Sequence, residues 1–216
     1  MKSPILGSSY VARSVNAADN RMVNLFPEIV PEGGKEPAFL QRAPGMSAGI
    51  TLGGTGPVSA MLAYTYGSSR YLVVVRGQVV YTSINGAAFV GRGSIGGAAN
   101  LDNLVTMAHN DTQVFIANRY ANTAWVMNKA TFALTQEAGS TFGPDNIAVA
   151  VCAYLDGYFI FNQPDSNRLY VSNLLDGTTI DPLAWASADG SPDLTRAIAV
   201  INGELWVFGQ TSIEVW

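Results

Sequence analysis

Six aspartates gather in one stretch of the sequence where acid–base chemistry could take place. They are Asp156, Asp165, Asp176, Asp181, Asp189 and Asp193. Two carboxylates on either side of a sugar can act as the acid and the nucleophile of a glycosidase, and calcium takes six to eight oxygen ligands. The EF-hand spacing is absent, and three of the six precede a glycine, as turn residues do. Glycan binding or glycoside hydrolysis by loop carboxylates is therefore the alternative function, and we assign no catalytic or metal-ligating residue.

Other chemistry-bearing residues stand alone. His109 is the single histidine, next to Asn110 and Asp111, and is predicted to be a turn histidine bonded to the backbone. Cys152 is the single cysteine, so it can form no internal disulfide, and its apolar surroundings predict an inert core thiol. Residues 91–96 fit the spacing G-x-G-x-x-G, but they follow a hairpin and open no helix, so we expect no phosphate there. The sequence thus predicts no catalytic residue, no metal and no cofactor.

The elements that hold these residues repeat along the chain. A glycine- or Asx-containing turn recurs at Gly67, Asn110, Asp156 and Asn202, at spacings of 43, 46 and 46 residues. An apolar run typical of a buried strand follows each turn, at residues 72–75, 114–117, 158–161 and 205–208. A period of about 40 to 50 residues filled with strands indicates a radial array of small sheets. We therefore predict an all-β fold, a β-propeller with about four blades.

Differences in amino-acid composition divide the chain into a proline-rich arm and a propeller. Residues 1–56 hold five of the 10 prolines and show no sustained period, which predicts an extended proline-rich arm. Two short edge strands are expected in it, at residues 21–26 and 38–41. The propeller is assigned to residues 57–216. Its blades are expected at residues 57–97, 98–143, 144–193 and, incomplete, 194–216.

The fourth strands of the blades are the least regular part of the pattern. They are expected at residues 87–90, 131–134 and 183–186, and the glycine-rich segment 91–97 is expected to cross to the next blade. The last blade has three strands in the sequence. Either the arm supplies its missing outer strand and closes a four-bladed ring, or this chain is the front portion of a longer product; we favour the second interpretation, because Trp216 ends the chain within a sheet.

Charge is unevenly spread along the chain. Residues 1–100 hold 8 basic and 4 acidic side chains, whereas residues 101–216 hold 4 basic and 12 acidic ones. An acidic half argues against DNA binding by phosphate neutralisation. No secretory signal follows Lys2, and no apolar run has the length of a membrane span. We therefore expect a soluble product made in the cytoplasm, without a membrane partner.

Six stretches of the sequence resemble a known family. The stretches are residues 16–28 (NAADNRMVNLFPE), 40–46 (LQRAPGM), 172–176 (SNLLD), 186–193 (ASADGSPD), 202–209 (NGELWVFG) and 212–216 (SIEVW). In these stretches the chain resembles the packaged-DNA stabilisation proteins of short-tailed bacteriophages, which are head-to-tail hub or nozzle subunits and tail accessory factors.

The resemblance implies a structural virion protein rather than an enzyme. It implies a six-fold homo-oligomeric ring that contacts the portal or its adaptor and other tail proteins. Such a ring extends the portal channel and helps to retain and release double-stranded DNA, which passes without tight binding. The implied location is the virion tail, and the host cytoplasm during assembly. In the arm, Arg21, Glu28 and Arg42 are the residues expected to make inter-subunit contacts.

Overall fold

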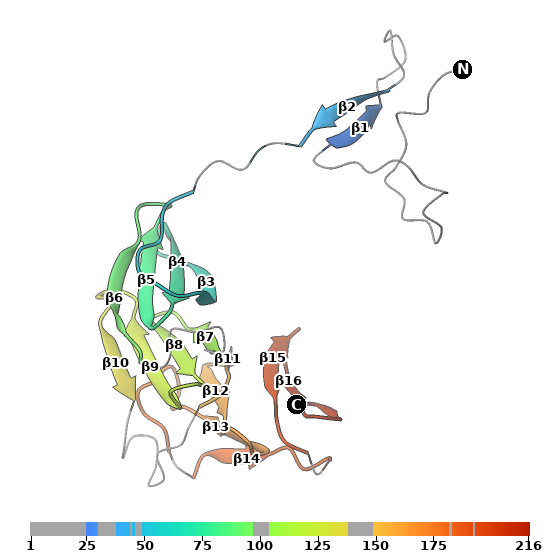
Figure 1. The fold of residues 1–216 in the computed structure, drawn as a ribbon. Coiled ribbons are helices and arrows are strands. Elements are labelled where there is room, and N and C mark those ends of the chain that lie inside the picture. The colour runs from blue at the N-terminus through green and yellow to red at the C-terminus, as the bar shows by residue number, and fades with distance from the viewer. Residues whose placement is uncertain are drawn as a thin grey trace. The chain divides into compact units, whose positions relative to one another are not determined.

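The computed structural model describes residues 25–29, 38–43, 45, 49–96, 104–137, 149–181, 183–191 and 193–216. It divides into two compact units, with the boundary between Gly49 and Ile50. In the first unit, β1 (Leu25–Ile29) pairs antiparallel with β2 (Ala38–Arg42). Residues 21–24, with which the first predicted strand begins, lie outside the described residues. The second unit holds four small sheets (Figure 1).

Three sheets in the second unit have four antiparallel strands each, in sequence order from one edge to the other. Blade 1 contains β3 (Val58–Tyr66), β4 (Ser69–Arg76), β5 (Val79–Ile84) and β6 (Val90–Ser94). Blade 2 contains β7 (Val105–His109), β8 (Gln113–Asn118), β9 (Thr123–Asn128) and β10 (Leu134–Glu137). Blade 3 contains β11 (Cys152–Leu155), β12 (Tyr158–Asn162), β13 (Arg168–Val171) and β14 (Trp185–Ser187).

The fourth sheet has three strands among the described residues. Blade 4 contains β15 (Ala197–Ile201), β16 (Glu204–Phe208) and β17 (Ile213–Val215). The first strands of successive blades lie next to one another, β3 by β7, β7 by β11 and β11 by β15. This succession of sheets is the predicted all-β, four-bladed propeller arrangement, so the fold class is confirmed.

Alternate residues of each second strand explain how the blades pack. In β8, Val114 and Ile116 point toward blade 1, whereas Phe115 and Ala117 point toward blade 3. Successive side chains of a strand point to opposite faces of the sheet, so one apolar run can serve two neighbouring blades. We call the face toward the preceding blade the leading face, and the face toward the following blade the trailing face.

Three apolar cores lie between the four blades. The core between blades 1 and 2 contains Val73 and Val75, both fully buried. Between blades 2 and 3, the Phe115 ring stacks at 5.4 Å from Phe159 and 5.7 Å from Phe161. The third core packs Ile160 and Leu169 of blade 3 against Leu205 and Val207 of blade 4. Each blade therefore shelters the apolar face of the next one from water.

Hairpin turns use the residues that the sequence indicated. Asn85 and Gly86 have φ angles of 50° and 77°, and Asn202 and Gly203 have 54° and 84°. Positive φ at both central positions is the geometry of the tight hairpin turn whose twist matches that of the strands. Asp156 is a third such residue, with φ 50°.

The outer strands begin later than predicted. β6 runs from Val90 to Ser94 and so occupies the first part of the segment 91–97, which was expected to be a crossing. The prediction was wrong because neighbouring side chains occupy the space over its glycines: a Cβ at Gly91 would lie 3.6 Å from the Tyr81 ring, and one at Gly93 would lie 3.2 Å from Leu134. β10 and β14 start three and two residues after the predicted positions 131 and 183.

Candidate functional site: contacts between blades and the end faces of the propeller

The loop that follows β13 ties blade 3 to blade 2. Asn110 donates from Nδ2 to the Leu175 carbonyl at 2.9 Å, and the Gly177 amide donates to Gln113 Oε1 at 2.8 Å. The same glutamine donates from Nε2 to Asp176 at 3.2 Å. Residues of the β7–β8 turn and the first residue of β8 thus hold an insertion that lies more than 60 positions further along the chain.

Asp176 acts as the organiser of this loop. Its Oδ1 accepts hydrogen bonds from the Thr178 amide at 2.9 Å and hydroxyl at 2.7 Å, and Oδ2 accepts one from Thr179 at 3.0 Å. Burial alone would raise the pKa of Asp176, but the hydrogen bonds from Thr178, Gln113 and Thr179 outweigh burial and hold the pKa below its ordinary value. Asp176 is therefore an ionised loop anchor, which is unsuited to donate a proton.

Asp193 has the same role at the entry to blade 4. Oδ2 accepts from the amides of Thr211 at 2.7 Å and Ser212 at 3.0 Å, and Oδ1 accepts from the Ser212 hydroxyl at 3.0 Å. The bond from the Thr211 amide is the largest cause of a pKa below the ordinary value for Asp193. The carboxylate thus fixes the β16–β17 turn to the segment that leads into β15.

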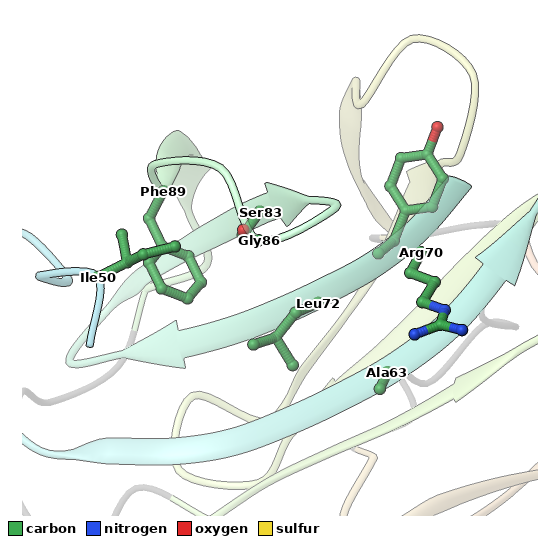
Figure 2. Close-up of a pocket in the computed structure, with 8 residues that line it drawn as sticks. Ile50, Ala63, Arg70, Leu72, Ser83, Gly86 and Phe89 are labelled. Carbon is green, nitrogen blue, oxygen red and sulfur yellow. The ribbon is translucent and has the colours of Figure 1, made fainter. Parts of the chain in front are cut away.

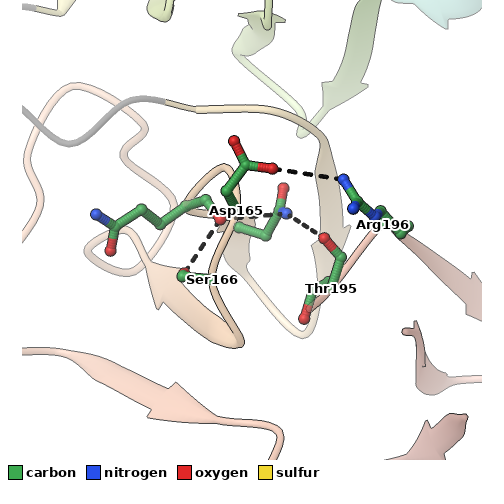
Figure 3. Close-up of polar contacts among 6 residues, drawn as sticks. Asp165, Ser166, Thr195 and Arg196 are labelled. Atoms are coloured by element: carbon green, nitrogen blue, oxygen red, sulfur yellow. Dashed lines mark hydrogen bonds and ion pairs between the residues drawn. The ribbon is translucent and has the colours of Figure 1, made fainter. Parts of the chain in front are cut away.

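The other four candidate aspartates are also turn or surface residues. Asp165 forms an ion pair with Arg196 at 3.4 Å (Figure 3), and its side chain is 73% exposed, so the pair contributes little stability. Asp181 accepts from the Leu183 amide at 2.9 Å, and Asp189 accepts from Asn167 at 2.9 Å and Ser187 at 2.6 Å. In the described ranges, no three His, Cys, Asp or Glu side chains are grouped so that they could hold a metal ion.

Two apolar hollows lie on the propeller unit, and none of the six aspartates lines either one. The first, of about 410 Å³, opens on the face of blade 1 that is turned away from blade 2. Ile50 lies beside Phe89 at one end of this hollow, and Arg70 lies at the other end (Figure 2). The second, of about 400 Å³, lies between blades 3 and 4. Neither of these two hollows therefore has the convergent acids expected of a glycosidase.

His109 lies in a cluster at the contact between blades 1 and 2. Its Nδ1 lies 3.1 Å from the Lys129 ammonium and 3.3 Å from the Asn110 carbonyl oxygen. Lys129, 2% exposed, also donates to the Asn110 carbonyl and lies 4.2 Å from the centre of the Tyr64 ring. His109 is thus bonded to the backbone of its turn, as predicted, and it also lies within hydrogen-bond distance of a buried lysine.

Burial shifts the pKa values in this cluster. It lowers the pKa of His109, with a further contribution from the Lys129 charge, and it lowers the pKa of Lys129. It also raises the pKa of Tyr64 to about 12, and the Tyr64 hydroxyl has no hydrogen-bond partner among the described residues. The ring of His109 lies 5.3 Å from that of Tyr64. The Lys129 ammonium, the rings of Tyr64 and His109, and the Asn110 carbonyl therefore form a set of contacts between blades 1 and 2.

Glu137 and Cys152 are two further titratable residues that are buried in the propeller unit. Burial, followed by the Asp176 charge, raises the pKa of Glu137 to about 7, and its Oε1 has no described hydrogen-bond partner. Sequence analysis missed Glu137; its place in an outer strand gave no signal of burial. Burial raises the pKa of the Cys152 thiol to about 11, and the Cys152 amide donates to Thr106 Oγ1 at 3.0 Å. The expectation of an inert core thiol is met at Cys152.

The predicted arm contacts lie on the β1–β2 hairpin or outside it. Glu28 and Arg42 are exposed, and they pair in register with Phe39 and Leu25. Arg21 lies outside the described residues. No helix in the described part of the chain combines the length and apolarity that a membrane span requires.

These features define a β-propeller whose described polar side chains hold turns and blades together. The chain matches the family model described as bacteriophage P22 Gp10, β-propeller, over residues 1–216. The chain belongs to this family of phage DNA-stabilisation, tail-hub proteins, and it is a structural component of a phage virion. The resemblance seen in the sequence is thereby confirmed.

Comparison with solved structures shows the propeller fold alone. The structure titled "YCF48 bound to D1 peptide" has a TM-score of 0.53 at 12% identity, covering 90% of this chain and 61% of that one. "Dihydro-heme d1 dehydrogenase NirN in complex with DHE" has a TM-score of 0.52 at 12% identity, covering 73% and 34%. The chain thus spans less than two thirds of each. No curated protein matches this sequence.

Proposed function

We propose that this chain is a head-to-tail hub or nozzle subunit of a phage tail. In this proposal six copies form a ring below the portal or its adaptor, extend the portal channel, and help to retain packaged DNA until release. The family match over residues 1–216 supports the structural role. The distribution of charge over the blades is the observation that supports a conduit for DNA.

Blades 3 and 4 are strongly acidic. Residues 149–216 hold eight Asp or Glu and two Arg side chains, and many of the acids lie in exposed turns. The strands β3, β7, β11 and β15 contain no Asp, Glu, Lys or Arg at all. We place the acidic turns of blades 3 and 4 toward the DNA conduit, because each phosphate that a protein neutralises adds a salt-dependent grip, which would impede sliding.

The conduit is tested by reversing charge on exposed acids. Wild-type chain should not bind a 30-base-pair duplex in 50 mM salt, whereas the double variant Asp165→Arg/Asp189→Arg should bind it, with an affinity that falls steeply as salt rises. In phage, the same variant should slow ejection of DNA from purified virions. Wild-type ejection by a variant that binds duplex in solution would contradict the placement of these turns.

We further propose that the arm makes the contacts between subunits, through Arg21, Glu28 and Arg42. Glu28 and Arg42 are exposed on a hairpin of their own unit, which leaves them available to a neighbour. Deletion of residues 1–49 should leave a β-rich, cooperatively melting propeller by circular dichroism and abolish incorporation into virions. Normal incorporation of the deleted protein would refute the role of the arm.

Negative-stain microscopy separates the ring from other assemblies. Six-fold rings with a central hole, or density at the portal vertex of virions that is lost without this protein, are the expected result. A monomer that does not associate with purified portal complexes would contradict the hub assignment.

A further inference from the structure

Two exposed leucines lie side by side in the loop that follows β13. Leu174 is 60% exposed and Leu175 is 54% exposed. Both contact the turn between β11 and β12, where a Cβ atom at Gly157 would lie 2.7 Å from Leu174 and 3.7 Å from Leu175. Tyr158, the next residue after Gly157, is exposed as well. We call Leu174 and Leu175 the leucine knob; it is an apolar patch on the surface of blade 3.

The main chain holds the leucine knob in a conformation that leucine rarely adopts. Leu175 has a φ angle of 59°, in the left-handed region that suits Gly or Asn. Its amide donates to the Gly157 carbonyl at 2.7 Å, and its carbonyl accepts from Asn110 Nδ2 at 2.9 Å. A half-exposed leucine adds little to the fold at a position where its backbone is strained. Contact with another chain accounts for it, because a rigid apolar patch loses little conformational freedom on binding.

Acidic side chains lie at the same end of blade 3 as the knob. The β11–β12 turn and the β13–β14 connection share this end, because successive strands of the sheet are antiparallel. These two segments contain Asp156, Asp176 and Asp181 and no Lys or Arg, and Asp156 and Asp181 are exposed. Two identical knobs would bring like charges together, so copies should not meet through this surface on both sides. A complementary partner surface has an apolar centre and an exposed cation.

The hairpin β1–β2 carries this combination. Leu25 lies directly opposite Arg42 and therefore on the same face, which also carries Leu40, two residues before Arg42. Leu25 is 40% exposed, Leu40 is half-buried and Arg42 is exposed. Glu28, the one acidic residue in the sequence of the two strands, lies opposite Phe39 and hence on the other face. No third strand pairs with this hairpin among the described residues, and a two-stranded hairpin alone is marginally stable in water.

We propose that the hairpin β1–β2 of one copy docks on the leucine knob of a neighbouring copy. The knob packs against Leu25 and Leu40, and Arg42 lies against the aspartates beside the knob. One copy offers the hairpin and the next offers the knob, which is the head-to-tail type of contact from which rings are built. This contact rests on the proposed role of the arm between subunits and identifies the surface that receives the arm. The turns at Asp165 and Asp189, which we place toward DNA, are at the opposite end of blade 3 and stay free.

Disulfide cross-linking of full-length chains tests the contact. Chains with Leu40→Cys are mixed with differently tagged chains with Leu175→Cys and oxidised mildly, in concentrated solution and in purified virions. A mixed dimer should form in several-fold excess over the dimers of either variant alone. Cys152 stays in place because it is buried. Tyr120→Cys, 52% exposed in the β8–β9 turn, is the matched control for Leu175→Cys and should give no mixed dimer.

A chain that carries both Leu40→Cys and Leu175→Cys distinguishes a neighbouring copy from the chain's own arm. Contact between copies should give a ladder of covalent oligomers, whereas a link within one chain would give a monomer of altered mobility and would overturn the proposal. Absence of the mixed dimer in every sample would also overturn it, and if rings still form, the hub assignment stands without this contact. A mixed dimer from a chain that forms no ring would support the contact and contradict the hub.

Charge reversal tests the ionic part of the contact. Arg42→Glu should lower the rate of mixed-dimer formation about threefold to tenfold, because the hairpin then meets aspartates of like charge. Asp156→Arg and Asp181→Arg, introduced together in the chain that carries Leu175→Cys, should restore the rate. Arg70→Glu, at an exposed arginine of blade 1, is the control and should leave the rate unchanged. Equal effects of Arg42→Glu and Arg70→Glu would overturn the proposal.

Leu175→Asn separates association from folding. Asn adopts a positive φ angle more readily than Leu, so the free energy of unfolding should stay the same or rise. Cross-linking between Leu40→Cys chains and Leu174→Cys chains should nevertheless become several-fold slower when the second chain also carries Leu175→Asn. Val90→Ser, 49% exposed on β6, should change neither quantity. Unchanged cross-linking, or a loss of stability that matches the loss of cross-linking, would overturn the proposal, because Leu175 would then serve the fold alone.

Discussion

The amide of Gly177 in blade 3 donates to the side-chain oxygen of Gln113 in blade 2 at 2.8 Å, above the stacked rings of the core between the two blades. A Cβ atom at position 177 would lie 3.0 Å from the Phe159 ring and 3.1 Å from the Phe115 ring. The close approach of the loop to the core thus requires that residue 177 has no side chain.

Gly177→Ala should therefore lower the free energy of unfolding by about 1–3 kcal/mol, because the new methyl group must displace two packed rings. Urea denaturation of the variant measures the change. Gly49→Ala is the control: nothing lies within 4 Å of its Cβ position, so we expect a change within about 0.5 kcal/mol. Equal stability of the two variants would show that the loop does not press on the core.

His109 makes stability depend on pH below neutrality. Its pKa is lowered in the folded protein, so the unfolded chain takes up a proton at a higher pH than the folded one does. Stability should fall as pH decreases from 7 through the ordinary histidine value of about 6.5. Denaturation of wild type and His109→Gln between pH 7 and 5 measures this, and the variant should show the smaller loss. If wild type and variant lose the same stability between pH 7 and 5, protonation of His109 does not destabilise the folded protein.

Glu137 makes the stability of the folded protein depend on pH in the direction opposite to His109. Its pKa rises from 4.5 to about 7 on folding, so the folded state holds a proton that the unfolded state releases. Stability should be lost as pH rises from about 4.5 to about 7. Glu137→Gln keeps the neutral shape and should be more stable than wild type by roughly 1–2 kcal/mol at pH 8 and equal to it at pH 4. A variant that is less stable at pH 8 would indicate that the carboxylate has a cationic partner.

Asp193 should govern one turn rather than the whole fold. Asp193→Ala removes the acceptor of the Thr211 and Ser212 amides, so their hydrogen exchange should accelerate at least tenfold. The thermal midpoint should change little, because the carboxylate is at the surface. Asp189→Ala, which removes a surface carboxylate that bonds Asn167 and Ser187, is the control and should leave both amides unaffected. If the exchange rates of these amides are unchanged in Asp193→Ala, the turn is held by its own backbone hydrogen bonds and not by the carboxylate.

The inner strands of the fold could be predicted from the sequence because one signal recurs at a fixed interval. The second strand of every blade is a continuous apolar run, since both of its faces are buried, and the turn before it contains Gly or Asx. Gln113–Asn118, Tyr158–Asn162 and Glu204–Phe208 accordingly lie where the pattern predicts. A strand that is buried on both faces can therefore be recognised in the sequence as a continuous run of apolar residues.

The outer strands and the polar contacts gave weaker signals. β6 contains Gly91 and Gly93 because side chains from β5 and β10 cover them, and those neighbours are known only from the fold. Trp185 and Trp216 are partly exposed at the hollow between blades 3 and 4. Lys129 is buried beside Tyr64 although the sequence places it in a turn. Each of these features depends on contacts between residues that are distant in the sequence.

The stacking of blades has a consequence for how the chain opens. The second strand of blade 2 contributes side chains to two cores at once, Val114 and Ile116 to one and Phe115 and Ala117 to the other. Local opening of β8 would expose both cores to water, so blades 1, 2 and 3 should open together rather than one after another. A protease added to the native chain should then make few cuts within these three blades until all of them unfold.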